Sequence, residues 1–262
     1  MGDFLHDNDV YKDGMQYDWH NKEKDDDIEF YIRWMKKLGG SALELACGTG
    51  RILIPASEQG LDVTGIDIAS DMLKQARAKA KEFNANPVLI HGDIRNFKLD
   101  KKFSLIYLPF NSIAHLYTIK DVEQCFQCVR EHLTLDGRFI IDYFNPDLNY
   151  FVRDSEEKFP VNSFQDDNTG AKVTITESNK YDRATQINHI KWFKTIGCIN
   201  EEINTLTMRI FFPQELAGLF VCNGFEIVQK YGKFDETPFT SDSQTQIIVS
   251  KLKAEKKGNL FS

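Results

Sequence analysis

The chain has 262 residues, with 32 Lys or Arg against 39 Asp or Glu, so its formal net charge at neutral pH is −7. With 42% hydrophobic and 27% charged residues, the composition is that of a globular protein and excludes wholesale disorder. Proteins that coat nucleic-acid backbones usually carry a basic surface, which an acidic total disfavours. We therefore expect a protein that acts on small molecules, without a nucleic-acid partner.

The five cysteines are scattered along the chain, unlike those of a small secreted disulfide framework. Cys125 and Cys128 have CxxC spacing, but they fall in an apolar helical pattern, so we interpret them as buried thiols and predict no metal site. No apolar run approaches the roughly 20 residues that cross a bilayer, and the N-terminus lacks the features of a secretion signal. We expect a cytoplasmic protein without a membrane partner; the oligomeric state is not indicated.

The first forty residues begin as a polar, acidic leader and become amphipathic. The aspartates at 25–27 are expected to cap a helix that ends at Gly39. Short apolar runs then alternate with segments of helical period. Strands are predicted at 42–45, 63–66, 88–90, 103–108 and 138–142, and helices at 51–59, 70–83 (capped by Ser70) and 119–133. This alternation predicts a parallel sheet with helices on both faces.

Between residues 144 and 212 the apolar period becomes two, as in the pair Val173 and Ile175. The pattern predicts three or four antiparallel strands inserted into the α/β chain, with a turn at 182–184. A helix resumes at Pro213, because proline is favoured at the first helical position. Two further strands are predicted at 225–228 and 246–249.

The segment Glu44-Leu-Ala-Cys-Gly48-Thr-Gly50 lies where a strand turns sharply into a helix. Glycines at such a turn let a ligand approach the backbone, as in NAD and FAD folds. However, Leu53 stands where the dinucleotide fingerprint requires a third glycine. Glu44 is unfavourable beside a pyrophosphate and favourable beside a cationic ligand.

Two more carboxylates follow strands. Asp67 ends the second strand, where Rossmann folds place an acidic residue on a ribose diol, and Asp93 follows the third strand. Each of them alone is equally well explained as a turn or helix cap. Together with Glu44, they surround the crevice at the carboxyl ends of the strands, which favours a binding site.

These motifs together resemble those of the class I S-adenosylmethionine-dependent methyltransferases, from about Gly39 to Asn145. Ala46 departs from the family pattern, which has glycine at that position. The resemblance implies S-adenosylmethionine as the cofactor. It implies that the methionine part lies at Ala46, Gly48 and Gly50 with Glu44 nearby, the ribose at Asp67, and the adenine at Ile68, Met72, Asp93 and Ile94.

The resemblance also indicates residues near the transferred methyl group. His115 follows the fourth strand, where this family lines its acceptor pocket, and is a candidate base; it could instead cap a helix or shape the pocket. Tyr17-Asp18 resembles a pair whose aromatic ring closes over the methyl group in relatives, or Tyr17 is simply exposed in the leader. Residues 109–112 do not reproduce the Asn-Pro-Pro-Tyr motif of amino-methylating nucleic-acid enzymes.

The insertion resembles the lid of small-molecule members, including sugar-amine and glycine N-methyltransferases. Tyr181, Trp192 and Arg209 are candidate acceptor contacts, although side chains of this kind also simply pack a sheet.

The resemblance implies a Rossmann-like, doubly wound sheet of seven strands with an antiparallel insertion. The predicted division is a leader and helix at 1–40, a cofactor domain at 41–145 and 213–252, a lid at 146–212 and a charged tail at 253–262.

The implied function is methyl transfer to a small-molecule acceptor, an amine or a hydroxyl. An NAD-dependent oxidoreductase and a non-catalytic S-adenosylmethionine-binding protein are the alternatives.

Overall fold

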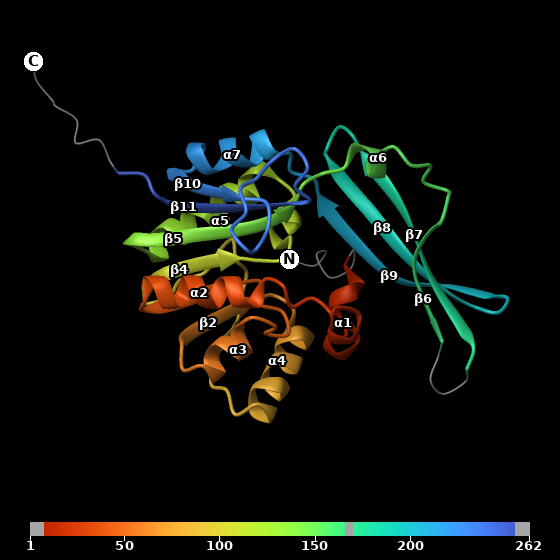
Figure 1. The fold of residues 1–262 in the computed structure, drawn as a ribbon, viewed down its shortest axis with the longest axis horizontal. Helices are drawn as coiled ribbons and strands as arrows, with labels where there is room; N and C mark the ends of the chain where they lie inside the picture. Colours follow the sequence, from red (N-terminus) through yellow and green to blue (C-terminus); the bar gives the residue numbers. More distant parts are fainter. Residues whose placement is uncertain (1–7, 166–169, 255–262) are drawn as a thin grey trace, which may run out of the picture.

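The computed structural model describes residues 8–165 and 170–254, which form two β-sheets (Figure 1). The larger sheet has seven strands. Their order across the sheet is β10 (Phe225–Tyr231), β11 (Thr245–Leu252), β5 (Leu133–Phe144), β4 (Phe103–Leu108), β1 (Ser41–Leu45), β2 (Asp62–Asp67) and β3 (Val88–His91). The predicted seven-stranded sheet is confirmed.

The strands from β5 to β3 pair in parallel, whereas β11 runs antiparallel to both β5 and β10. All five residues of β1 are buried, because a central parallel strand has helices on both of its faces. The strand order reverses between β1 and β4, which are neighbours although they are not consecutive in the chain. Open α/β sheets bind ligands outside the carboxyl ends of the strands at such a switch point.

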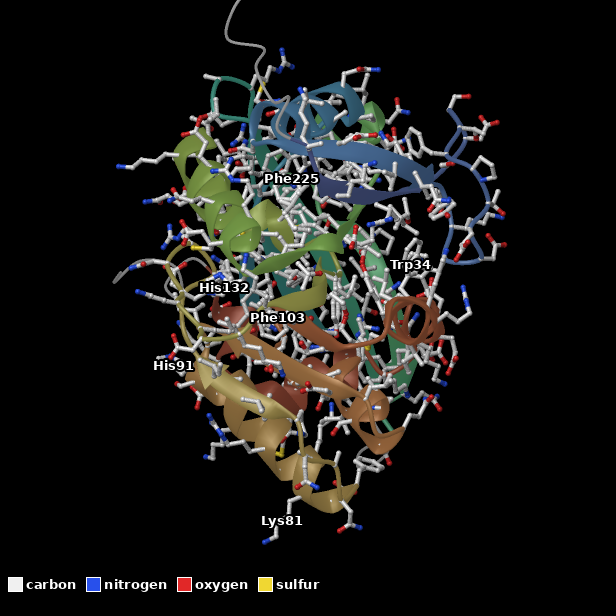
Figure 2. The ribbon with its side chains drawn as sticks, turned by 90° about the vertical axis from the view of Figure 1, so that its left-hand side faces the viewer. Trp34, Lys81, His91, Phe103, His132 and Phe225 are labelled. Atoms are coloured by element: carbon white, nitrogen blue, oxygen red, sulfur yellow. The ribbon has the colours of Figure 1, made fainter. Side chains whose placement is uncertain are left out.

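Two helical layers cover the sheet. One contains α2 (Ile28–Leu38), α3 (Leu53–Glu58) and α4 (Ser70–Glu82), and the other α5 (Ile119–His132) and α7 (Pro213–Cys222). Figure 2 shows Trp34 of α2 and His132 of α5 on opposite sides of Phe103 in β4. Alternate residues of each strand therefore enter different cores, as Phe139 of β5 packs with α5 and α7 while Ile140 packs with α2 and α3.

The insertion is a sheet of four antiparallel strands, in agreement with the predicted three or four. They are β6 (Phe159–Gln165), β7 (Lys172–Asp182), β8 (Ile187–Ile196) and β9 (Ile199–Arg209), in that order across the sheet. It lies beside the carboxyl ends of the large sheet, with α1 (Gly14–His20) between it and α4 (Figure 1). The sheet is thus placed to cover the ligand crevice.

The N-terminal segment joins the two sheets. The side chain of Asn8 accepts a hydrogen bond from the Thr207 amide of β9 and donates one to the Tyr117 hydroxyl. The Asp9 carboxylate, in the 3-10 helix η1 (Asp9–Tyr11), accepts from the Thr205 amide. Sequence patterning did not predict η1, α1 or the short helices η2 (Ser112–His115) and α6 (Leu148–Phe151).

Two predicted helix caps are corrected by the structure. Asp27 stands at the N-cap of α2, but its carboxylate makes no cap bond there and binds the Arg51 guanidinium instead. Ser70 is the first residue of α4, and Ala69 occupies the cap position. For Asp27 a tertiary contact replaces the local cap bond that the sequence suggests. For Ser70 the helix boundary is shifted by one residue.

Further predictions concern the cysteine pair, membrane-spanning segments and the two ends of the chain. Cys125 and Cys128 are buried free thiols in α5, as interpreted, and burial raises the pKa of both. No helix among the described residues is long and apolar enough to cross a membrane. Of the predicted leader and tail, residues 1–7 and 255–262 lie outside the described residues.

Candidate functional site

The glycine-rich turn after β1 adopts a left-handed backbone. Gly48 has φ of 52° and Gly50 of 77°, values that favour glycine. Ala46 also has φ of 55°, so the alanine that replaces the family's glycine sits in a conformation that costs an L-residue about 1 kcal/mol.

Asp67, at the end of β2, holds that turn in place. Its Oδ2 accepts a 2.7 Å hydrogen bond from the Gly48 amide, and its Oδ1 accepts one of 2.7 Å from the Ala69 amide. Burial raises the pKa of Asp67, while the bonds from Ala69 and Gly48 oppose the rise. The carboxylate is therefore held rigidly at the carboxyl ends of the strands.

A cavity of about 370 Å³ opens above this turn. Seven of the nine predicted cofactor residues line it: Ala46, Gly48, Asp67, Ile68, Met72, Asp93 and Ile94. Its size and mixed lining are those of a small-molecule site. The glycine turn, the buried carboxylate and the apolar Ile68 and Met72 fit the methionine, ribose and adenine parts of S-adenosylmethionine.

Glu44 and Gly50 are not among the residues that line the cavity. Glu44 is buried on the α2 face of β1, where its Oε2 accepts a 2.9 Å hydrogen bond from the Tyr107 hydroxyl. A Cβ on Gly50 would lie 3.0 Å from Ile54. The predicted places of Gly50 at the methionine part and of Glu44 nearby stay predictions, since both residues lie next to the turn but outside the cavity wall.

Asp93 lines the cavity but already has a cationic partner. Its carboxylate accepts hydrogen bonds from the Arg95 amide at 2.9 Å and from the Arg95 guanidinium at 2.7 Å. Burial opposes ionisation, but the Arg95 hydrogen bonds outweigh it and lower the pKa of Asp93. The same guanidinium also binds Asp121, at 2.7 Å. Arg95 also lines the cavity, and the sequence motifs did not identify it.

A second cavity, of about 400 Å³, lies between the N-terminal segment and the antiparallel sheet. Most of its wall is aromatic or aliphatic. Trp19 of α1 and Phe164 of β6 meet edge-to-face at 5.3 Å on this wall. Trp192 also lines the cavity, as predicted for an acceptor contact. Tyr181 and Arg209 do not; Tyr181 packs on Phe151, and Arg209 binds Glu215.

Three side chains belong to the walls of both cavities: Tyr11, Tyr17 and His115. The Tyr11 hydroxyl lies 2.8 Å from Nε2 of His115, and its ring is 5.8 Å from that of Tyr17. Burial lowers the pKa of His115 to about 4. The structure therefore brings the two predicted catalytic residues together, and it adds Tyr11, which sequence reasoning missed.

Asp18 anchors the helix that carries Tyr17. Its carboxylate accepts hydrogen bonds from Thr49 in the glycine turn and from Gln75 and Lys79 of α4. Asp13 caps the same helix by accepting from the amide of Met15 at 2.9 Å. In the predicted Tyr-Asp pair, Tyr17 thus lines the cavities and Asp18 holds the helix of Tyr17 in position.

Known proteins match the part of the chain that contains this site. A family model described as a methyltransferase domain matches residues 42–137, which contain every predicted cofactor residue. The chain is 30% identical to the dTDP-3-amino-3,6-dideoxy-alpha-D-glucopyranose N,N-dimethyltransferase of Streptomyces fradiae, over 51% of this chain and 50% of that enzyme. It is 26% identical to a putative methyltransferase of Bacillus subtilis, over 88% and 93% of the two chains. Residues 42–137 are therefore a methyltransferase domain.

Solved structures share the fold of this chain over nearly its whole length. The CcbJ methyltransferase of Streptomyces caelestis matches with a TM-score of 0.78 and 21% identity, covering 94% of this chain and 98% of that one. The S-adenosylmethionine-bound amino pentose methyltransferase CalS10 of Micromonospora echinaspora matches with a TM-score of 0.66 and 18% identity, over 91% and 96%. At these identities the likeness establishes the fold, including the antiparallel sheet.

Glu44 gives the protein a distinctive pH dependence. Burial raises the pKa of this carboxyl from 4.5 to about 8, so between these pH values the folded state holds a proton that the unfolded state has lost. The free energy of unfolding therefore falls with rising pH in this window, by at most about 1.4 kcal/mol per pH unit from this group. Glu44→Gln should remove that part of the slope in urea titrations from pH 5 to 8.

The control for this prediction is Glu58→Gln, which makes the same chemical change at an exposed position of α3. Asp142, whose pKa burial raises to about 6, adds its own slope in every variant and cancels in the comparison. Identical slopes for the wild type and Glu44→Gln would show that Glu44 is not protonated in the folded state.

Proposed function

We propose that the chain transfers a methyl group from S-adenosylmethionine to an amine of a small molecule. One observation carries this proposal: a cavity that fits the cofactor and a separate, largely apolar cavity meet at Tyr11, Tyr17 and His115. Such an arrangement holds two reactants on either side of one contact point, which is the main requirement of an in-line displacement. Residues 41–145 and 213–252 would hold the cofactor, and residues 146–212 would close the acceptor side.

S-adenosylmethionine supplies an electrophilic methyl group on a sulfonium, which a lone pair attacks as the carbon–sulfur bond breaks. In our proposal, Ala46 and Gly48 receive the methionine part, Asp67 accepts the ribose hydroxyls, and Ile68 and Met72 contact the adenine. These residues line one cavity around a rigid carboxylate. Asp93 and Ile94 complete the adenine side.

The environment of His115 favours an amine over a hydroxyl. A neutral amine already presents a lone pair, whereas a hydroxyl must lose its proton during transfer. With a pKa of about 4, His115 is neutral at pH 7, and burial disfavours the imidazolium that deprotonation of an alcohol would produce. We therefore assign His115 and Tyr11 to orienting the amine by hydrogen bonding, in place of a strong general base.

Relatives act on acceptors of the proposed class. The similar enzymes of Streptomyces fradiae and Streptomyces venezuelae are N,N-dimethyltransferases of amino sugars, and a glycine/sarcosine N-methyltransferase is also similar over half of this chain. This chain covers only 50%, 47% and 47% of these three relatives, so their acceptors are guides to a class. A cytoplasmic location remains a prediction of the sequence.

The proposal is tested by turnover with matched acceptors. The protein is incubated with S-adenosylmethionine and amine–alcohol pairs such as benzylamine with benzyl alcohol and glucosamine with glucose, and S-adenosylhomocysteine is measured by mass spectrometry. We expect product above the acceptor-free background with at least one amine and not with its alcohol. Product with alcohols only would overturn the amine assignment.

The two alternative functions make different predictions for the same protein. A non-catalytic S-adenosylmethionine-binding protein would bind the cofactor in calorimetry and form no S-adenosylhomocysteine with any acceptor. An NAD-dependent oxidoreductase would bind NAD tightly and S-adenosylmethionine not at all. The Leu53 position disfavours the latter, because it lacks the third glycine that brings a dinucleotide-binding helix against its strand.

A further inference from the structure

The second cavity contains a carboxylate that the proposed methyl transfer does not use. Among the described residues that line this cavity, Glu177 is the sole Asp, Glu, Lys or Arg. His20 also lines it, but burial lowers the pKa of that imidazole, which therefore adds no positive charge at neutral pH. The cavity thus combines aromatic walls with one negative charge.

Two hydrogen bonds hold Glu177 in a fixed position. Nε1 of Trp192 donates to Oε2 of Glu177 at 2.9 Å, and the hydroxyl of Tyr150 donates to Oε1. Glu177 of β7 and Trp192 of β8 face each other across the strands, so the indole is oriented by the sheet itself. Donors on both oxygens fix the orientation of the carboxylate and leave lone pairs on it for a ligand.

Glu177 lies away from the point where the two cavities meet. Its strand pairs with β8, where Trp192 pairs in turn with Asn204 of β9. The adjacent Thr205 of β9 binds Asp9, two residues before Tyr11. Because neighbouring strands are about 4.8 Å apart, the β7 backbone at Glu177 is roughly 10 Å from β9. Glu177 accordingly lines the second cavity but not the first, unlike the three side chains where the cavities meet.

We propose that Glu177 selects acceptors that carry an organic cation, such as a second ammonium group, apart from the nitrogen that is methylated. A fixed carboxylate beside indole and phenyl rings is the chemistry that recognises organic ammonium groups. Trp192 provides both an orienting donor and a ring, and Trp19 and Phe164 extend the aromatic wall. This inference names the acceptor class of the proposed methyltransferase and so rests on that function.

The experiment uses a cation and its uncharged isostere as probes. Choline and 3,3-dimethylbutan-1-ol have the same shape and differ by one positive charge. Their dissociation constants are measured by calorimetry at pH 7.5 in saturating S-adenosylhomocysteine, for the full chain and for Glu177→Gln. We expect the wild type to bind choline at least about tenfold more tightly than the isostere, and the variant to prefer it by less than about threefold.

The matched control is Glu201→Gln, the same change at an exposed residue of β9 that does not line the cavity. This control should retain the wild-type preference. If Glu177→Gln fails to fold, Glu177→Asp serves instead, because withdrawing the charge by one methylene should also reduce the preference while leaving binding of the isostere unchanged. A wild type without a preference for choline, or a folded Glu177 variant that keeps it, overturns the inference.

Failure of this inference is distinguishable from failure of the proposed function. Affinity for S-adenosylhomocysteine and turnover with simple amines report on the function and do not require Glu177. A protein that methylates amines but shows no charge preference retains its function and loses this acceptor assignment. A protein that binds no S-adenosylhomocysteine contradicts the function, whereas the ratio of probe affinities still reports on the cavity.

Discussion

Replacing Tyr17 with alanine should lower kcat about hundredfold while changing the affinity for S-adenosylhomocysteine by no more than about fivefold. Tyr17 lies on the walls of both cavities, so its ring separates the proposed cofactor from the acceptor and shapes their contact point. Removing the ring would admit water and allow the acceptor nitrogen several orientations. Because in-line displacement depends on alignment, a small loss of positioning produces a large loss of rate.

The matched control for this prediction is Tyr17→Phe, which keeps the ring and removes the hydroxyl. Burial raises the pKa of the Tyr17 phenol, so it stays protonated near neutral pH and is not available as a base. We therefore expect kcat of Tyr17→Phe within about threefold of the wild type, a change of less than about 0.7 kcal/mol in the barrier. If both variants lost activity equally, the hydroxyl would be the functional group and the positioning role of the ring would be wrong.

Asp67→Ala should weaken the affinity for S-adenosylmethionine and S-adenosylhomocysteine by about ten- to a hundredfold, because hydrogen bonds to a carboxylate contribute about 1.5–3 kcal/mol. The loss has two sources in this structure. The variant lacks the acceptor for the ribose hydroxyls, and it also lacks the oxygen that fixes the Gly48 amide at 2.7 Å. Calorimetric titration of the folded variant measures the combined effect.

A graded series separates these two sources. Asp67→Asn keeps an oxygen for one backbone amide but loses the charge, so its affinity should lie between those of the wild type and Asp67→Ala. Asp62→Asn, at the exposed start of the same strand, removes only a surface pair with Lys101 and should leave affinity unchanged. An unchanged affinity in a folded Asp67→Ala would remove Asp67 from the proposed cofactor site.

The positions of most strands and helices along the chain were predictable from the sequence because their signals are local. Apolar runs such as residues 103–108 and the helical period of residues 119–133 depend only on neighbours along the chain. The lining of the first cavity, where we propose that the cofactor binds, was predictable for a related reason. Ala46, Gly48 and Asp67 follow the ends of adjacent parallel strands, and a doubly wound sheet brings those ends to one edge.

The surroundings of Glu44 could not be predicted from the motif alone. The sequence places a carboxylate four residues before Gly48, but not which face of β1 it occupies or what lies there. The structure puts it against Tyr107 of β4, 63 positions later in the chain, and away from the cavity wall. Side chains of a strand point alternately to its two faces. Whether Glu44 reaches the cavity therefore depends on how the sheet is oriented relative to the glycine-rich turn.

By itself, the sequence determined the doubly wound sheet, its antiparallel insertion and most of the lining of the first cavity, because periodicity and strand-end positions act over short distances in the chain. Only the tertiary structure decided the acceptor side. Tyr11 meets His115 across 104 positions, and Glu177 joins Trp19 around one cavity although no motif links them. Such contacts form when the N-terminal segment packs between two sheets, and long-range packing of this kind leaves no periodic signal in the residues that make it.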